Sequence, residues 1–158
     1  MIDQGFEPRS IARDPIAQKF TLKEAPVLSA GRFDAVLART EGFAARVKVY
    51  AEGGENATHT HLKEDHLFLV LAGQAVFEVG RDGGETIVAN PYEGVFLPRG
   101  AFYKFLSSGE ENLLMFRVGG FEAEDRMRVA PDGSALLGDS ARNNHVDGVV
   151  VGERRFKN

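Results

Sequence analysis

The chain has 158 residues, 43% of them hydrophobic and 27% charged, which is ordinary for a soluble globular protein of one domain. Its formal net charge of −4 argues against a nucleic-acid binder, because such proteins carry an excess of basic residues. There is no cysteine, so disulfides, thiolate metal ligands and cysteine nucleophiles are excluded. No apolar run approaches the roughly 20 residues that span a bilayer, and the polar start lacks a secretion signal. We therefore expect a cytoplasmic protein with no membrane partner.

The predicted elements are short strands between two less regular ends. Residues 1–31 show weak periodicity and are interpreted as an N-terminal arm. From residue 32 to residue 120, short runs rich in Val, Leu, Phe or Tyr alternate with turn-forming residues, a pattern typical of an all-β sandwich or barrel. Residues 121–158 are polar and turn-rich, and we expect them to form a tail that packs on the barrel or on a partner subunit. The runs are RFDAVLART, FAARVKVYA, DHLFLVLAGQAVFEVG, ETIVA, EGVFLP, AFYKFLSS and NLLMFRVGG.

Three of the four histidines, His59, His61 and His66, lie within eight residues. His59 and His61 are separated by one residue, so on a strand their side chains share a face. If the following LKED closes a hairpin, His61 lies directly opposite His66 and three imidazoles converge on a point able to hold a divalent metal. A hairpin that slips by one residue would turn Asp65 inward instead. Otherwise Asp65 and Glu64 are interpreted as solvated loop acids.

This segment resembles the first motif of the cupin superfamily. That motif reads glycine, five residues, His-x-His, three or four residues, glutamate, six residues, glycine. Gly53, His59, His61 and Gly73 fit these spacings, and His66 stands at the glutamate position.

The segment YEGVFLPRGAFYKFLS resembles the second cupin motif, which reads glycine, five residues, Pro-x-Gly-x-x-His, three residues, asparagine. Gly94, Pro98 and Gly100 match in type, although Gly94 lies closer to Pro98 than the motif asks. Tyr103 stands at the histidine position and Ser107 at the asparagine position. Pro98-Arg99-Gly100 by itself also indicates a tight turn. The resemblance covers about residues 40–120.

The resemblance implies a jelly-roll β-barrel over residues 32–120 with a pocket at one end. Carried over from the cupin motifs, the metal-site positions are His59, His61, His66 and Tyr103. A metal held by three neutral imidazoles keeps its full charge, which makes it a stronger Lewis acid that favours anionic ligands. The expected cofactor is therefore a divalent transition metal (Fe, Zn or Ni), held by the three histidines. Sites of three histidines in cupin-like enzymes are associated with non-haem iron dioxygenases.

Tyr103 has three interpretations: a phenolate metal ligand, a protonated hydrogen-bond donor or general acid, and an inert pocket-lining aromatic. We assign it the catalytic role. Other candidates are less specific. Phe68, Val70 and Phe105 are expected to line the pocket, and His145 belongs to the tail. Arg46, Lys48, Arg99 and Arg117 are possible anion binders, but surface charge is the better interpretation for most of them.

Three functions are compatible with these residues. The first is a metal-dependent enzyme with dioxygenase-like, lyase or isomerase chemistry on a small organic anion. The second is a non-catalytic cupin that binds a small ligand. The third is a metal-free isomerase or epimerase that uses a histidine base and Tyr103 as acid. A homodimer is also expected, because the run HLFLVLAGQAVFEV is apolar on both faces and needs a cover on both.

Overall fold

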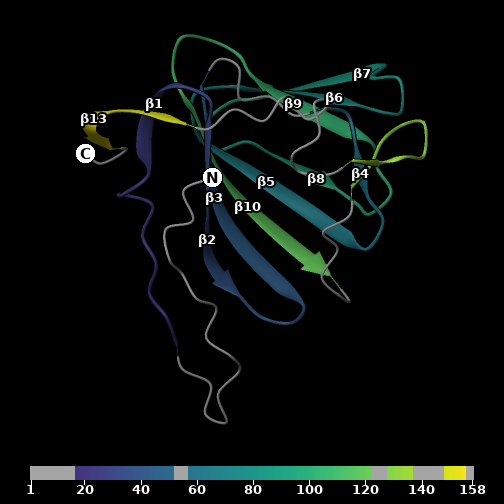
Figure 1. Cartoon of the computed structure of the whole chain (residues 1–158), viewed down its shortest axis with the longest axis horizontal. Helices are drawn as coiled ribbons and strands as arrows, with labels where there is room; N and C mark the ends of the chain where they lie inside the picture. The colour runs from purple at the N-terminus through teal and green to yellow at the C-terminus, as the bar shows by residue number, and fades with distance from the viewer. Residues whose placement is uncertain (1–16, 52–56, 122–127, 137–147, 156–158) are drawn as a thin grey trace.

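The structure, a computed structural model, describes residues 17–51, 57–121, 128–136 and 148–155 (Figure 1). Every regular element in these ranges is a β-strand, which confirms the predicted all-β class. Across the same residues there is no helix with the length and apolarity needed to cross a membrane.

The strands form two main sheets and two small ones. Strands β2, β3, β10, β5 and β8 make a five-stranded sheet in that order, and β7, β6 and β9 make a three-stranded sheet. These two sheets lie as two layers, while β1 pairs with β13 at one end of the molecule and β4 lies near the other end (Figure 1). The strands are β1 (Pro26–Ala30), β2 (Arg32–Arg39), β3 (Phe43–Tyr50), β4 (Thr60–His61), β5 (Glu64–Ala72), β6 (Ala75–Val79), β7 (Glu85–Ala89), β8 (Gly94–Leu97), β9 (Tyr103–Ser107), β10 (Leu113–Phe121), β11 (Arg128–Val129), β12 (Ala135–Leu136) and β13 (Val149–Arg155).

The main core lies between the two layers. Phe68 of β5, Phe77 of β6 and Phe105 of β9 are each at most 1% exposed, and their ring centroids lie 5.4–5.5 Å apart. Alternation places them there, because every second residue of a strand points to the same face of its sheet. On β5 the same alternation also turns Glu64 and His66 inward, next to the aromatic core.

A second apolar cluster lies on the outer face of the five-stranded sheet. Residues 17–30 cover part of this face, with Leu22, Ala25 and Leu28 in the cluster. The ring of Phe20 stacks on that of Phe116 at 5.9 Å. The outward apolar face of the sheet is therefore partly covered by the chain itself.

Two glycines of the second motif are required by local geometry. A Cβ at Gly94 would collide with the carbonyl oxygen of Phe68 on the neighbouring strand β5. Gly100 has a φ of 87°, a conformation that other residues rarely adopt. The turn before β9 closes with a bond of 3.0 Å from the amide of Ala101 to the carbonyl of Pro98, which confirms the predicted tight turn.

The predicted hairpin at LKED is wrong. Strand β4 pairs with β11, where His61 lies opposite Arg128, whereas β5 pairs with β8 and β10. Strand β5 already begins at Glu64, so two residues, Leu62 and Lys63, turn the chain from one sheet into another. Glu64 is the first residue of β5, and its side chain points inward because pairing with β10 extends the strand to this residue.

Candidate metal centre

The three clustered histidines converge, although by a different route from the predicted one. The ring centroids of His59 and His61 are 5.2 Å apart, and those of His61 and His66 are 4.4 Å apart. Two backbone hydrogen bonds of 3.0 and 2.9 Å tie His59 to Tyr103 at the start of β9. His61 comes from β4 and His66 from β5. The rings therefore meet where three sheets come together.

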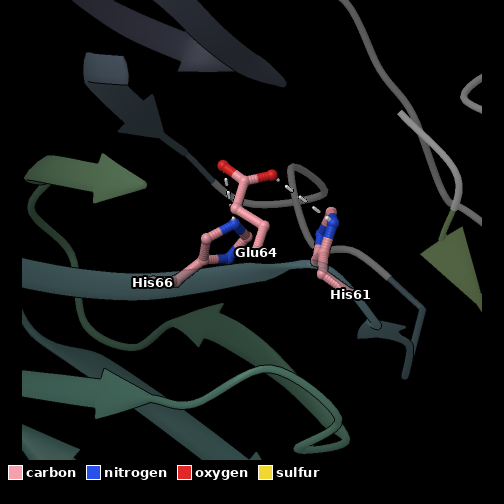
Figure 2. Close-up of side chains that lie close together, drawn as sticks. All are labelled: His61, Glu64 and His66. Carbon is pink, nitrogen blue, oxygen red and sulfur yellow. Dashed lines mark ion pairs between the residues drawn. The ribbon is translucent and has the colours of Figure 1, made fainter. Parts of the chain in front are cut away.

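Glu64 joins this cluster, so its interpretation as a solvated loop acid is wrong. It is 7% exposed, and Figure 2 shows its carboxylate between the two rings of His61 and His66. Its Oε1 lies 3.1 Å from Nε2 of His66, and its Oε2 lies 3.9 Å from Nδ1 of His61. One ligand atom from each of these three residues lies within 4.8 Å of the others. Glu64 shares parity with His66, but alternation turns its side chain inward only because pairing with β10 extends β5 to this residue.

A glycine provides the space for that carboxylate. Gly119 of β10 lies directly opposite His66 of β5. A Cβ at Gly119 would overlap Oε1 of Glu64, whereas a Cβ at the next residue, Gly120, would meet nothing within 4 Å. The absence of a side chain at Gly119 therefore lets Glu64 lie beside His66.

Arg117, one of the four possible anion binders, is part of the same buried cluster and is not a surface charge. It is 9% exposed and lies on β10 opposite Phe68. Its Nη2 donates a hydrogen bond of 2.6 Å to Oε1 of Glu64 and a second one to Nε2 of His66. Because one nitrogen bonds to both side chains, Arg117 holds the carboxylate and the imidazole together.

The other basic candidates are paired with acids. Arg46 and Lys48 both bind Asp34, Arg46 at 2.7 Å. Burial alone would raise the pKa of Asp34, but Lys48 and Arg46 more than offset it and hold the pKa below its usual range. At the surface, the amide of Arg99 and its guanidinium bind Asp65 at 2.8 and 2.9 Å. Asp65 therefore faces away from the histidines.

The hydrogen-bond partners of His59 and His66 indicate their tautomers. Nδ1 of His59 lies 2.7 Å from the carbonyl oxygen of Ala57, which only accepts, so this Nδ1 carries the proton. Nε2 of His66 lies 3.1 Å from Oε1 of Glu64, which only accepts, and closer to Nη2 of Arg117, which only donates. We assign the tautomer from the closer contact: Nε2 accepts from Arg117, and Nδ1–H donates to the hydroxyl of Tyr103 at 2.9 Å. A histidine that ligates a metal usually donates its other N–H to such a partner. His59 and His66 thus each keep one lone pair, on Nε2.

Burial keeps the three histidine side chains neutral, which is the protonation state that binds a metal. It lowers the pKa of His59 to about 4, and burial together with Arg117 lowers the pKa of His66 to about 2. The pKa of His61 is lowered too, first by burial and then by the neighbouring imidazoles. All three are therefore neutral at pH 7, which is the ligating form. Burial raises the pKa of Tyr103, so its phenol stays protonated.

The donor set fits a divalent ion. Nδ1 of His61 is buried and has no hydrogen-bond partner, which is costly unless something else takes its place. Imidazole nitrogen and carboxylate oxygen are ligands of Zn, Fe and Ni. Phe68, Val70 and Phe105, predicted to line a pocket, pack in the core instead, with the ring of Phe68 5.9 Å from that of His66. His145 lies outside the described residues.

No protein-family model matches the sequence, and no curated protein matches it. Solved structures do resemble the fold. The cupin domain of Schizosaccharomyces pombe Cnp3 is 22% identical with a TM-score of 0.53, over 58% of this chain and 65% of that domain. A Klebsiella pneumoniae protein with a double-stranded β-helix domain is 18% identical with a TM-score of 0.59, over 68% and 88%. The chain has the cupin fold. Streptomyces PAC13, solved with uridine, is 16% identical with a TM-score of 0.51, over 67% of this chain and 83% of that one.

Within the cupin fold of this chain, residues of the two motif segments lie side by side. His59, His61 and His66 come from the first motif and Tyr103 from the second, and all four rings lie together. Glu64 lies between the motif's ligand positions, so no motif position pointed to it. Arg117 comes from β10, outside both motifs.

Proposed function

We propose that the protein is a metal-dependent enzyme with dioxygenase-like, lyase or isomerase chemistry on a small organic anion. The observation that carries this proposal is the group His61, Glu64 and His66, whose ligand atoms lie within 4.8 Å of one another in a nearly buried site. Arg117 already pairs with the Glu64 carboxylate, but Nδ1 of His61 is left buried without a hydrogen-bond partner, and a cation bound there would offset that cost. A divalent Fe, Zn or Ni ion is such a cation.

His61, Glu64 and His66 would hold the ion, whereas His59, also predicted as a ligand, is not in the group whose ligand atoms lie within 4.8 Å of one another. When bound, such an ion supplies Lewis-acid chemistry: it polarises a ligand oxygen and lowers the pKa of a water. The carboxylate of Glu64 offsets part of the ion's charge. The ion alone therefore does not explain a preference of the site for anionic ligands, and basic side chains near the cluster must contribute to it.

Basic side chains around the cluster support an anionic ligand. Arg117, Lys48 and Arg128 each lie close enough to the imidazole of His59 to lower its pKa. Arg117 pairs with Glu64, and Lys48 and Arg46 both pair with Asp34, so three cations face two carboxylates in this group. This excess of positive charge would attract an organic anion. The structure of PAC13 with uridine shows a small organic molecule with a protein of this fold.

Tyr103 is the proton donor that we propose for this site. Its hydroxyl oxygen accepts the bond from His66, so its own proton is available for a ligand. Burial keeps this phenol protonated at neutral pH, as a hydrogen-bond donor or general acid requires. His66 positions the hydroxyl by its 2.9 Å bond.

Metal analysis of protein purified without a histidine tag tests the proposal. We expect about one transition-metal ion per chain, in the native preparation or after loading with Zn²⁺, by the stoichiometry of a three-ligand site. A His61→Ala variant should lose that ion, while a Lys63→Ala variant, next to the site in sequence, should keep it. If the native chain neither contains nor takes up an ion at micromolar concentrations, the metal-dependent function is wrong.

A metal-free isomerase is the second candidate, and one observation favours it. His66 and Tyr103 form a hydrogen-bonded pair at 2.9 Å, and such a pair can act as base and acid. Arg117 would then supply the positive charge that stabilises a developing anion. Turnover that persists in full after exhaustive chelation would favour this candidate.

A further inference from the structure

Arg117 occupies the position on His66 that a metal needs. A neutral imidazole has one N–H and one lone pair. In His66 the N–H is on Nδ1 and points to Tyr103 at 2.9 Å, so the lone pair is on Nε2. That lone pair accepts the hydrogen bond from Nη2 of Arg117. Because one lone pair serves one partner, His66 cannot bind both the guanidinium and an ion.

The same competition applies to Glu64. Oε1 of Glu64 lies 2.6 Å from Nη2 of Arg117 and 3.1 Å from Nε2 of His66. An ion bound to both atoms at about 2.0–2.2 Å would lie against this nitrogen. Two like charges in such a buried place also repel strongly. The guanidinium therefore has to move when the ion binds.

A displaced guanidinium has no second carboxylate ready for it in the described part of the interior. Asp34 is already bound by Arg46 and Lys48. Asp65 faces the other side of β5 and is bound by Arg99. A buried arginine without a partner is costly, so it would favour an anion from outside.

We propose that Arg117 is an internal competitor for the metal site, which leaves Glu64 and His66 when a metal binds and then receives the anionic group of the ligand. This inference rests on the proposed metal-dependent function. It makes metal and anion binding cooperative, because each one favours the displaced position of the same side chain.

Calorimetric titration of Zn²⁺ into chelator-treated protein tests the competition. We expect Arg117→Met to bind Zn²⁺ about tenfold more tightly than the native chain, a typical size for coupling between sites. Arg117→Gln keeps a donor near Glu64 and should show the same direction if Arg117→Met does not fold. Arg99→Met is the matched control, because Arg99 also pairs with an acid of β5 but lies at the surface. The Zn²⁺ affinity of this variant should equal that of the native chain.

The outcomes separate the two proposals. If the native chain binds Zn²⁺ and both Arg117 variants bind it equally or more weakly, the competition is overturned while the metal-dependent function stands. If neither the native chain nor any variant binds an ion, both are overturned.

Anion cooperativity gives a second readout on the native chain. Replacing chloride by acetate at constant ionic strength should tighten Zn²⁺ binding in the native chain and in Arg99→Met, and the gain should vanish in Arg117→Met. Equal gains in all three would mean that acetate acts without Arg117, and would overturn its role as the anion receptor.

Discussion

At the scale of single residues, the candidate site is a chain of hydrogen bonds from Tyr103 through His66 to Arg117 and on to Glu64. Each member sets the protonation or position of the next. Arg117 makes Nε2 of His66 an acceptor, which places the proton on Nδ1 and directs it to the phenol. Such a buried network is stable only when every member has a partner. Removing one group should therefore affect its neighbours as well.

The first prediction concerns Tyr103→Phe, which leaves Nδ1–H of His66 buried without an acceptor. We expect the free energy of unfolding to fall by about 1–3 kcal/mol, the usual penalty for such a group. Urea denaturation at pH 7 measures it. Tyr92→Phe is the control, because Tyr92 is 84% exposed and its hydroxyl is in water. An equal change in both variants would contradict the role of the buried bond.

The second prediction concerns pH. Burial lowers the pKa of His59 from 6.5 to about 4, so between these values the unfolded chain binds more protons than the folded one. The free energy of unfolding of chelator-treated protein should therefore fall as the pH drops from 6.5 toward 4, by up to about 1.4 kcal/mol per pH unit for each such histidine. His61 and His66 act in the same sense. Glu64 acts in the opposite sense, because burial raises its pKa.

Urea denaturation at a series of pH values measures this slope. His59→Gln should remove up to about 1.4 kcal/mol per pH unit of it. A native slope that is flat between pH 6.5 and 4 would contradict the burial of neutral histidines.

At the scale of elements, β10 carries two adjacent glycines with different surroundings. Gly119 faces the cluster, where a Cβ would overlap the Glu64 carboxylate, and Gly120 faces away, where a Cβ would meet nothing within 4 Å. Strand alternation produces this difference. A substitution at Gly119 therefore tests the cluster, and the same substitution at Gly120 is its control on the same strand.

The third prediction follows from this pair. Gly119→Ala should push the carboxylate of Glu64 away from His66 and weaken Zn²⁺ binding about tenfold or more, as changes beside metal ligands do. The cost in stability should be small, because a flexible side chain gives way. Gly120→Ala should change neither the Zn²⁺ affinity nor the free energy of unfolding. Calorimetric titration measures the affinities, and an unchanged affinity in Gly119→Ala would argue against Glu64 as a ligand.

At the scale of the whole molecule, one region of the outer face is exposed among the residues that the structure describes. Residues 17–30 cover part of the five-stranded sheet, but Leu67 of β5 is 46% exposed and its cross-strand neighbour Phe96 of β8 is 62% exposed. Strand β8 is the last strand of this sheet. We propose that a second copy of the chain covers this apolar edge, because a twofold contact would bury the same pair from both copies.

The fourth prediction tests that homodimer. Light scattering at micromolar concentration should give a dimer for the native chain and a monomer for Phe96→Glu. Val88→Glu is the control, since Val88 is 50% exposed but belongs to the other layer, and it should stay dimeric. A native chain that is already a monomer at this concentration would contradict the dimer.

The sequence by itself determined the all-β class, the tight turn at residues 98–101 and the gathering of three histidines. These follow from local pattern: alternation defines strands, Pro and Gly define the turn, and the histidines are near neighbours in the chain. It did not determine which strands pair. β4 pairs with β11 and β5 with β10, and these distant pairings decided how the histidines meet.

Only the tertiary structure placed Glu64 and Arg117 in the site. They lie 53 residues apart in the chain, and the pairing of β5 with β10 brings them to 2.6 Å. A charged residue in a sequence reads as solvated, because burying one alone is costly. Glu64 and Arg117 are buried because each finds an opposite charge on the neighbouring strand, and no local sequence pattern shows that pairing.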